Sequence, residues 1–319
     1  MNVLVVGGSG YIGGVVTDLL HESPHATRVY DCLLYEECYR KRVDFVYGDI
    51  RDHDLLSRHL DWADAVVWLA ALVGDGACAL NTEIAVELNQ RSVSWLAQSF
   101  DGRIVFLSTC SVYGAQDAVL DETSSTGPLS VYAATKLAAE GYLADRDALI
   151  FRLGTIYGVG DLFSRIRLDL VVNAMTVRAV REGEITVFGG DQYRPLLHVR
   201  DVARAIVQNV DTAHTGVFNL HQSNVKILDL AATMQLHFPA LVVNTTEMTF
   251  EDARNYRVTS EKARSILGFE PKHTIDDGIE EVRALIESAR LKDVNDARYT
   301  NEGFLSANSH HLHYAAPRD

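Results

Sequence analysis

The sequence has little cysteine and no long apolar run, and each absence excludes a class of protein. Its 319 residues include four cysteines, whose spacing forms neither a C-x-x-C zinc pattern nor a disulfide framework. No stretch approaches the roughly 18 apolar residues that a membrane-spanning helix needs. The first residues, "MNVLVV", run into glycines without a basic segment, so we expect no signal peptide. We therefore expect a globular cytoplasmic protein.

Basic residues are also scarce relative to acidic ones. The chain has 29 Lys and Arg residues against 43 Asp and Glu residues, which gives a formal net charge of −14 at pH 7. Such a surface disfavours nonspecific attraction to nucleic acid or to an anionic membrane, so we expect neither as a partner. His310, His311 and His313 stand near the end of the chain, where we expect a surface tail over 291–319 and no metal site.

Glycines are concentrated near the start of the chain, directly after a short apolar run. "NVLVV" is typical of a buried strand, and a helical apolar pattern begins at Tyr11 and Ile12. Between them, Gly7, Gly10 and Gly13 form G-x-x-G-x-x-G. Glycines at this spacing allow a tight turn, close approach of the backbone to a pyrophosphate, and packing of the helix on the strand. The sequence therefore predicts a dinucleotide site, with phosphates facing the helix N-terminus.

Acidic residues follow the second and third expected strands. "TRVYDC" reads as the second strand, and Asp31 at its end can accept hydrogen bonds from a ribose 2′-hydroxyl while repelling a 2′-phosphate. NAD(H) is therefore favoured over NADP(H), with a strand-end cap as the alternative role for Asp31. Asp49 and Ile50 follow the third strand, where an adenine would lie; for Asp49 a simple turn carboxylate is equally compatible.

The alternation of strands and helices continues beyond the third strand. "ADAVVWLAA" and "RIVFLST" (103–109) read as further strands, separated by a helix at about 80–100. Strands that alternate with helices indicate a parallel sheet covered on both faces. We therefore predict the α/β class with a doubly wound parallel sheet.

Tyr132 and Lys136 stand at positions i and i+4 of an expected helix, "VYAATKLAAE". This spacing puts both side chains on one helical face. A nearby ammonium would stabilise a tyrosinate and lower the phenol pKa from its usual value of about 10. Such a tyrosine can remove a hydroxyl proton while a hydride leaves the same carbon for a nicotinamide.

These motifs together resemble the extended short-chain dehydrogenase/reductases, and among them the nucleotide-sugar epimerase/dehydratase group. The resemblance covers about residues 2–290 and rests on the glycine motif, Asp31, "LAA", "STCSVYG" and Tyr-x-x-x-Lys. It implies a Rossmann-type NAD-binding domain mainly within 1–160 and a smaller C-terminal lobe for a nucleotide-diphosphate sugar mainly within 161–290. The chain would cross back to the sheet near 185–225. It also implies a homodimer packed through helices at about 80–100 and 129–145.

The resemblance assigns roles to individual residues. Tyr132 would be the general base, Lys136 would anchor the nicotinamide ribose, and Thr109 would bond the sugar oxygen and the tyrosine. Asn89 matches a helix asparagine of the family, although a polar helix-face residue is an equal alternative. The implied cofactor-binding set is Gly7, Gly10, Tyr11, Ile12, Gly13, Asp31, Asp49, Ile50, Leu69, Ala70, Ala71, Asn89, Ser108, Tyr132 and Lys136.

The two residues that follow Thr109 bear on the type of reaction. Family members that eliminate water across C5 and C6 have an acid and a base carboxylate at these two positions, where this chain has Cys110 and Ser111. A thiol and a hydroxyl are poor replacements for a base that must take a C5 proton. We expect Cys110 to fill space beneath the sugar, with an acid role as the alternative. Dehydration is therefore disfavoured.

Arginines and an asparagine in the second half provide candidates for substrate binding. Arg194, before "HVRD", matches a family arginine that binds the nucleotide diphosphate, for which a planar guanidinium is well suited. For Arg165 and Arg167, phosphate binding and a solvated helix face remain open. The family's Arg-Pro-Gly-Asp segment is absent, and Arg254 or Arg257 would replace its phosphate contact. The implied substrate-binding set is Thr109, Cys110, Ser111, Asn173, Arg194, Arg165 and Arg257.

Four functions remain in order of preference. The first is an NAD-dependent nucleotide-sugar epimerase that transiently oxidises a carbinol carbon, most simply C4, with hydride transfer to tightly bound NAD. The second is a net NAD-dependent 4-dehydrogenase or 4-ketoreductase, which uses the same side chains. A 4,6-dehydratase comes third. A non-catalytic NAD-sensing regulator comes last, because it does not need Tyr132, Lys136 and Thr109 together.

Overall fold

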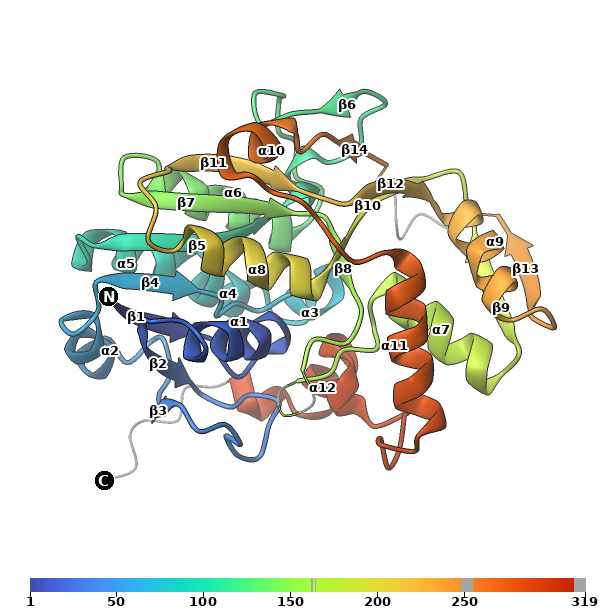
Figure 1. Ribbon diagram of the computed structural model, residues 1–319, viewed down its shortest axis with the longest axis horizontal. Coiled ribbons are helices and arrows are strands. Elements are labelled where there is room, and N and C mark those ends of the chain that lie inside the picture. Colours follow the sequence, from blue (N-terminus) through green and yellow to red (C-terminus); the bar gives the residue numbers. More distant parts are fainter. Residues whose placement is uncertain (162, 164, 248–254, 313–319) are drawn as a thin grey trace.

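A parallel sheet of seven strands forms the larger part of the protein (Figure 1). The computed structural model describes residues 1–161, 163, 165–247 and 255–312. In spatial order the strands are β11 (Gly216–Leu220), β7 (Ala148–Leu153), β5 (Arg103–Thr109), β4 (Ala65–Trp68), β1 (Asn2–Val6), β2 (Ala26–Asp31) and β3 (Asp44–Tyr47). All six pairings are parallel. The predicted doubly wound sheet is confirmed, and its strand order reverses between β1 and β4, where such sheets bind ligands.

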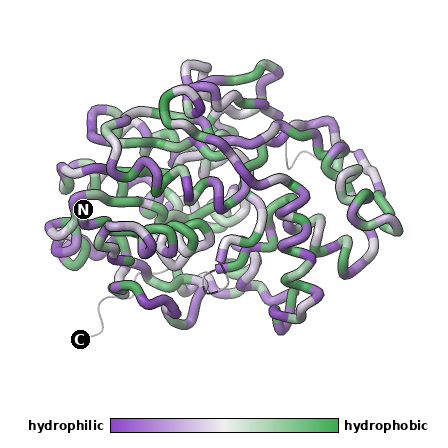
Figure 2. Tube along the Cα trace, viewed as in Figure 1, coloured by the Kyte–Doolittle hydropathy of each residue, from purple (hydrophilic) through white to green (hydrophobic). Residues whose placement is uncertain are grey.

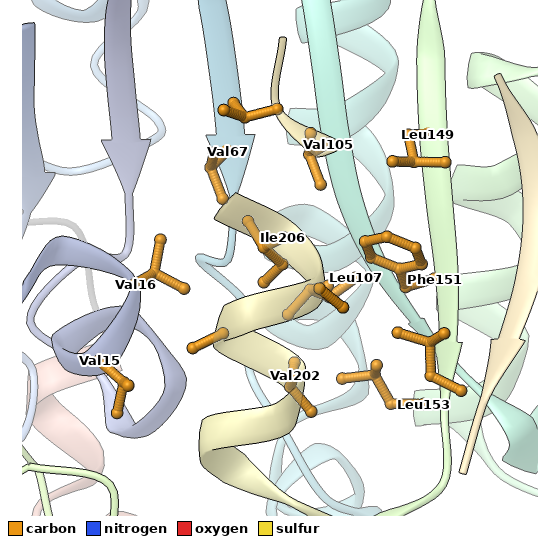
Figure 3. Packing of buried hydrophobic residues seen from close by; sticks show 14 of the residues in the cluster. Val15, Val16, Val67, Val105, Leu107, Leu149, Phe151, Leu153, Val202 and Ile206 are labelled. Carbon is orange, nitrogen blue, oxygen red and sulfur yellow. The ribbon is translucent and has the colours of Figure 1, made fainter. Parts of the chain in front are cut away.

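Helices cover both faces of this sheet, because successive strand residues point to opposite sides. On one face, α1 (Tyr11–His21) and α8 (Val199–Asn209) pack against the strands, and Val15, Val16, Val202 and Ile206 belong to one apolar cluster with Phe151 of β7 (Figure 3). On the other face lie α2 (His53–Leu60), α5 (Ser92–Ser99) and α6 (Val131–Leu143). The central strands are accordingly the hydrophobic part of the trace (Figure 2).

The single helix expected at about 80–100 is instead a broken series. It consists of α3 (Asp75–Leu80), α4 (Thr82–Val86), one π-helical turn η1 (Glu87–Arg91) and α5. Asn81 ends α3 with an extended backbone and caps α4, because its side-chain oxygen accepts from the N–H of Ile84 at 3.1 Å. A capping asparagine with non-helical dihedrals interrupts the helix at this point.

A smaller lobe follows β7 along the chain. Its two sheets are β8 (Thr155–Tyr157) with β10 (Tyr193–His198) and β12 (Ser223–Lys226), and β9 (Glu184–Phe188) with β13 (Val242–Thr246). These pack with α7 (Val171–Arg181), α9 (Ile227–His237) and α11 (Ile275–Glu287) around a separate apolar cluster (Figure 1). The chain returns to the large domain through α8 and β11. It returns a second time through α10 (Glu261–Leu267) and through β14 (Arg257–Val258), which pairs with β6 (Val119–Leu120).

The last described segment folds back onto the large domain. It contains η4 (Ala297–Tyr299), α12 (Asn301–Ala307) and η5 (Ser309–Leu312), and α12 packs on α3 (Figure 1). Leu305 and Leu312 are only 1% and 4% exposed. The segment therefore contributes to the core, whereas the sequence suggested a surface tail; His313 lies outside the described residues. Throughout the described ranges, no helix has both the length and the apolarity to cross a membrane.

Candidate active site

The glycine turn brings the N-terminus of α1 against the ends of β1 and β4. Gly7 has a φ of +89°, and a Cβ on it would lie 2.5 Å from the backbone nitrogen of Ala70. A Cβ on Gly13 would lie 2.2 Å from the carbonyl oxygen of Gly7. No larger residue fits at either position, so both glycines are required by this close approach. The N-cap of α1 is Gly10, which leaves the first N–H groups of the helix open to a ligand.

Two adjoining pockets flank this helix N-terminus. The first, which we call the β2-side pocket, lies at the carboxyl ends of β1, β2 and β3. Both pockets are lined by Leu69 and Ala71, which follow β4, so they adjoin beside the glycine turn. Of the predicted cofactor residues, the β2-side pocket is lined by Gly7, Gly10, Asp31, Asp49, Ile50, Leu69, Ala70 and Ala71.

Asp31 connects the glycine turn to the wall of the β2-side pocket. One carboxylate oxygen accepts from the N–H of Ser9 at 2.9 Å, and the other accepts from the N–H of Leu33 at 2.7 Å. Burial raises the pKa of this carboxyl group, and the two backbone hydrogen bonds oppose that rise. Asp31 therefore fixes the turn and also borders the pocket, so the capping role is observed and ribose binding stays a prediction. Asp49 forms an ion pair with Arg51 at 2.6 Å on the same wall.

The second pocket, which we call the Tyr132 pocket, collects residues from β5, α1, α6 and the smaller lobe. Of the predicted residues, it is lined by Tyr11, Ile12, Leu69, Ala71, Ser108, Thr109, Ser111, Tyr132 and Lys136. Ser130 caps α6 by accepting from the N–H of Ala133 at 3.2 Å, and its hydroxyl donates to Asp75 at 2.7 Å. The cap fixes the start of the helix that presents Tyr132 and Lys136.

The charge states of Tyr132 and Lys136 are determined mainly by burial. Burial lowers the pKa of Lys136 to about 8, against the opposing effects of Cys78 and Glu140. The ammonium group donates to the carbonyl oxygen of Leu107 at 2.8 Å. Burial raises the pKa of the Tyr132 phenol, as do Cys78 and Asp75, while Arg167 lowers it. The expected lowering of the phenol pKa is therefore wrong for this structure, because desolvation exceeds the effect of nearby cations.

Cys110 points away from the Tyr132 pocket although both of its neighbours line it. Residues Cys110–Tyr113 form a 3₁₀ turn, η2, which is capped by Thr109: its hydroxyl oxygen accepts from the N–H of Ser111 at 3.1 Å. The Cys110 thiol is fully buried in an apolar cluster and donates to the carbonyl oxygen of Arg152 at 3.2 Å. Its burial raises the thiol pKa. Assigning Cys110 to substrate binding therefore does not agree with its position.

The side-chain amides of two asparagines of the predicted site form hydrogen bonds with backbone groups. Asn89 exchanges two hydrogen bonds with Leu72, at 2.7 and 2.8 Å. Asn173 exchanges two with Gly158, at 2.9 and 3.1 Å, and donates to the carbonyl oxygen of Arg167 at 2.8 Å. Neither lines the β2-side pocket or the Tyr132 pocket, so direct contact of Asn89 with the cofactor or of Asn173 with the substrate does not fit this geometry. Both instead hold loops whose neighbouring residues do line the pockets.

The arginines are distributed differently from the expectation. Arg167 lines the Tyr132 pocket, whereas Arg165 lines the β2-side pocket. Arg194 is buried and donates to the carbonyl oxygen of Tyr193 at 2.9 Å, and Arg257 stacks on the ring of Tyr193 at 4.9 Å. Neither Arg194 nor Arg257 lines the Tyr132 pocket, so their assignment to the substrate is not supported by position. Arg254 lies outside the described residues.

One pocket residue, Tyr256, escaped the motif reasoning. Tyr256 is 3% exposed, lines the Tyr132 pocket, and its hydroxyl lies 3.2 Å from that of Ser111. It follows a stretch without a helix or strand pattern, so no periodicity pointed to it. Asp75 lines the same pocket from the start of α3. In the described part of the chain, no three His, Cys, Asp or Glu side chains are grouped as metal ligands.

The fold and the paired pockets define a Rossmann-type dinucleotide-binding enzyme. A family model described as "NAD dependent epimerase/dehydratase family" matches residues 3–220. The chain belongs to this family, and NAD is its cofactor. The residues present fit that group, because the glycine turn has no room for a Cβ and the N-terminus of α1 opens where the two pockets adjoin.

Individual relatives support the same placement. A UDP-glucose 4-epimerase of Rhizobium meliloti (strain 1021) is 31% identical over 314 residues, which cover 86% of this chain and 93% of the relative. The structure of DesIV, a dTDP-glucose 4,6-dehydratase from Streptomyces venezuelae solved with NAD, is similar with a TM-score of 0.78 and 26% identity, covering 91% of this chain and 98% of that one. A UDP-glucose 4-epimerase from Thermotoga maritima has a TM-score of 0.80 at 23% identity, covering 90% and 99%, and shows the shared fold.

Proposed function

We propose that this protein is a nucleotide-sugar epimerase that oxidises one carbinol carbon of its substrate, most simply C4, and reduces it again from the other face. The observation that carries the proposal is the combination in one pocket of Tyr132, Thr109 and Lys136 with no carboxylate in the two positions after Thr109. This set supports transfer of a hydroxyl proton and lacks the usual partners for eliminating water.

In this proposal each side chain has a distinct task. NAD, when bound, would supply the acceptor and donor for the hydride of the carbinol carbon. The Tyr132 oxygen, as tyrosinate, takes the carbinol proton when the hydride leaves and gives it back when the hydride returns. Because burial raises the pKa of this phenol in the protein without ligands, this step needs the positive charges of Lys136 and of bound NAD beside it. Thr109 and Ser111 offer hydroxyls to the sugar from η2 and its cap. Lys136 lies one helical turn beyond Tyr132, and its ammonium group donates to the carbonyl oxygen of Leu107. It anchors the nicotinamide ribose.

Dehydration is less well supported by the same pocket. Elimination across C5 and C6 needs a base for the C5 proton and an acid for the leaving hydroxyl. Cys110 faces Arg152 instead of the pocket, and Ser111 has only a hydroxyl to offer. The carboxylate that does line the pocket, Asp75, accepts a hydrogen bond from Ser130.

We propose a nucleotide-diphosphate sugar as the substrate. The curated relatives include UDP-glucose 4-epimerases from Rhizobium meliloti and Corynebacterium glutamicum, and this makes a UDP-hexose the first candidate. Arg167 supports the proposal from the structure, since it brings a guanidinium to the Tyr132 pocket and can pair with phosphate oxygens. Its carbonyl is fixed by Asn173, and its side chain lies 3.0 Å from Asp169.

A homodimer is part of the same proposal. The helices expected to form its interface, η1, α5 and α6, are adjacent on one face of the sheet. Tyr142 of α6 is 42% exposed on these helices, and its hydroxyl accepts from the side chain of Gln90 on η1 at 3.1 Å. Sedimentation velocity with Tyr142→Arg tests this, because a charged side chain in the interface should shift the protein from dimer to monomer.

The proposed reaction is tested by incubating the purified protein with UDP-glucose and other nucleotide sugars, without added NAD. Chromatography coupled to mass spectrometry should reveal an isomer of unchanged mass. A product lighter by two hydrogens, formed only when NAD is supplied, would indicate the net 4-dehydrogenase instead. Loss of water would indicate the dehydratase and contradict the role given to Cys110 and Ser111.

A further inference from the structure

Three segments that are far apart in the sequence meet at the β2-side pocket. Tyr35 comes from the loop after β2, and Arg165 comes from the segment after β8. The guanidinium of Arg165 stacks on the Tyr35 ring at 3.1 Å, and the ring of Phe304 on α12 contacts the same Tyr35 ring at 5.0 Å between centroids. Arg165 also donates to the carbonyl oxygen of Arg298 at 3.4 Å. Tyr35, Arg165 and Leu312 line the pocket, while Arg298 and Phe304 contact Arg165 and Tyr35. We call Tyr35, Arg165 and the C-terminal segment 297–312 the clasp.

The C-terminal part of the clasp is anchored at both of its ends. Asn301 donates to the carbonyl oxygen of Val73 at 2.6 Å, and its N–H donates to Asp169 at 2.7 Å. The carbonyl oxygen of Leu312 accepts from Arg51 at 3.1 Å, and Leu312 itself lines the pocket. The segment therefore spans from the loop beside the Tyr132 pocket to the far wall of the β2-side pocket.

Arg165 is a buried cation that forms no ion pair in the described part of the chain, although Asp169 and Glu36 act on its charge from a distance. The residue is 4% exposed and lines the β2-side pocket. Within the described ranges its Nε atom has no hydrogen-bond partner. Burial is the main effect on its pKa, which is lowered. A guanidinium removed from water needs an anion to offset its desolvation, and a planar fork suits a phosphate.

We propose that Arg165 binds a phosphate of the dinucleotide in the β2-side pocket and that the clasp slows release of the cofactor. The inference rests on the proposed function, because an epimerase returns the hydride to the same sugar and has no need to release NAD between turnovers. It also gives the C-terminal segment a task, namely to close the pocket after the cofactor has entered.

The test measures NAD release from the purified holoenzyme, not catalysis. The variants Arg165→Gln and Phe304→Ala are compared with the matched controls Arg178→Gln, an exposed arginine on α7, and Phe188→Ala, which is 49% exposed on β9. Release is followed by rapid desalting and by exchange with isotopically labelled NAD. The clasp predicts release about tenfold faster or more in Arg165→Gln and in Phe304→Ala, with both controls like the wild type. Arg165→Lys should recover part of the retention, since it keeps the charge.

The outcomes separate the clasp from the proposed reaction. Release at the wild-type rate in Arg165→Gln and Phe304→Ala would overturn the clasp, even if the protein epimerises nucleotide sugars. Faster release in both, in a protein that produces no epimer, would support the clasp and reject the epimerase. If either variant unfolds, the milder Arg165→Lys and Phe304→Leu replace them, and unchanged release in those two rejects the inference.

Discussion

Glu140 forms a two-pronged ion pair with Arg152 directly beneath the Tyr132 pocket. Arg152 reaches the two carboxylate oxygens at 3.0 Å through Nε and 2.6 Å through Nη2, and both residues are only 6% exposed. The same carboxylate bonds Ser108, which lines the pocket. Glu140 also stands one turn beyond Lys136 on α6 and raises the pKa of that ammonium. We regard Glu140 as a positioning residue that holds Ser108 and supports the charge of Lys136.

The variant Glu140→Gln should be less stable than the wild type, and its kcat should decline at a lower pH. Removing one charge of a buried pair leaves Arg152 uncompensated, which costs about 3–5 kcal/mol of unfolding free energy. The pKa of Lys136 should fall further, because Glu140 opposes the effect of burial. Denaturant unfolding and the pH dependence of kcat measure both effects. The control is Glu182→Gln, which changes an exposed residue of the smaller lobe. If the pH profile of Glu140→Gln does not shift, Glu140 has a structural role only.

Activity of the wild type should decline as the pH rises above about 8. Burial lowers the pKa of Lys136 to about 8, so its charged fraction is complete at lower pH and disappears as the pH rises through this value. If the charged form anchors the cofactor, kcat follows that fraction. Lys136→Arg, whose side chain stays protonated, should move the decline to higher pH. A wild-type rate that is flat to about pH 10 would exclude this dependence on Lys136.

The variant Tyr132→Phe should bind NAD and lose turnover. Loss of an acid–base group reduces kcat by about 10²–10⁴-fold, while the ring still fills its site. Single-turnover assays and NAD content measure the two properties separately. Tyr47→Phe is the control, since Tyr47 is 68% exposed on β3. Tyr132→Phe with unchanged NAD binding and an unchanged biological effect would favour the NAD-sensing regulator.

Variants of Arg167 and Arg165 should affect the substrate and the cofactor separately. Arg167→Gln is expected to reduce kcat/KM for the nucleotide sugar by about ten- to hundredfold, because a charge-assisted contact is lost. NAD release should stay as in the wild type. Arg165→Gln should show the reverse pattern, since the two arginines line different pockets. The same effect of both variants on KM would indicate that the pockets do not divide the ligands in this way.

Cys110 and Ser111 provide a test of the turn that follows β5. Cys110→Ala should leave kcat and KM unchanged and cost about 1 kcal/mol of stability, because the thiol is buried in an apolar cluster and donates to the carbonyl oxygen of Arg152. Ser111→Ala should reduce kcat/KM, since its hydroxyl faces the pocket beside Tyr256. Steady-state kinetics of the two variants decide the matter, and a large loss in Cys110→Ala would restore the thiol as a substrate contact.

Local patterns predicted the parts of the fold that local physics determines. The glycine turn, the strands around it and the parallel sheet followed from glycine spacing and from alternation of strands with helices. Tyr132 and Lys136 also share a pocket as their i and i+4 spacing requires. These features depend on residues close together in the sequence.

Side-chain direction and long-range contacts could not be predicted in this way. Cys110 and Ser111 are neighbours, yet a 3₁₀ turn sends one into the core and the other into the pocket. Asn173 has its amide occupied by Gly158 and Arg167, which no spacing reveals. Leu312 is buried in a cluster with Leu72 and Ala77, and its carbonyl oxygen accepts from Arg51, which lies 261 positions earlier in the chain.

The central claim is transient oxidation at one carbon by an enzyme that keeps its NAD. The most direct measurement uses UDP-glucose carrying deuterium at C4, incubated with the holoenzyme in ordinary water without added cofactor. The account predicts an epimer that retains the deuterium at C4, because the same hydride leaves and returns. An epimer that has lost the deuterium to solvent would contradict the account.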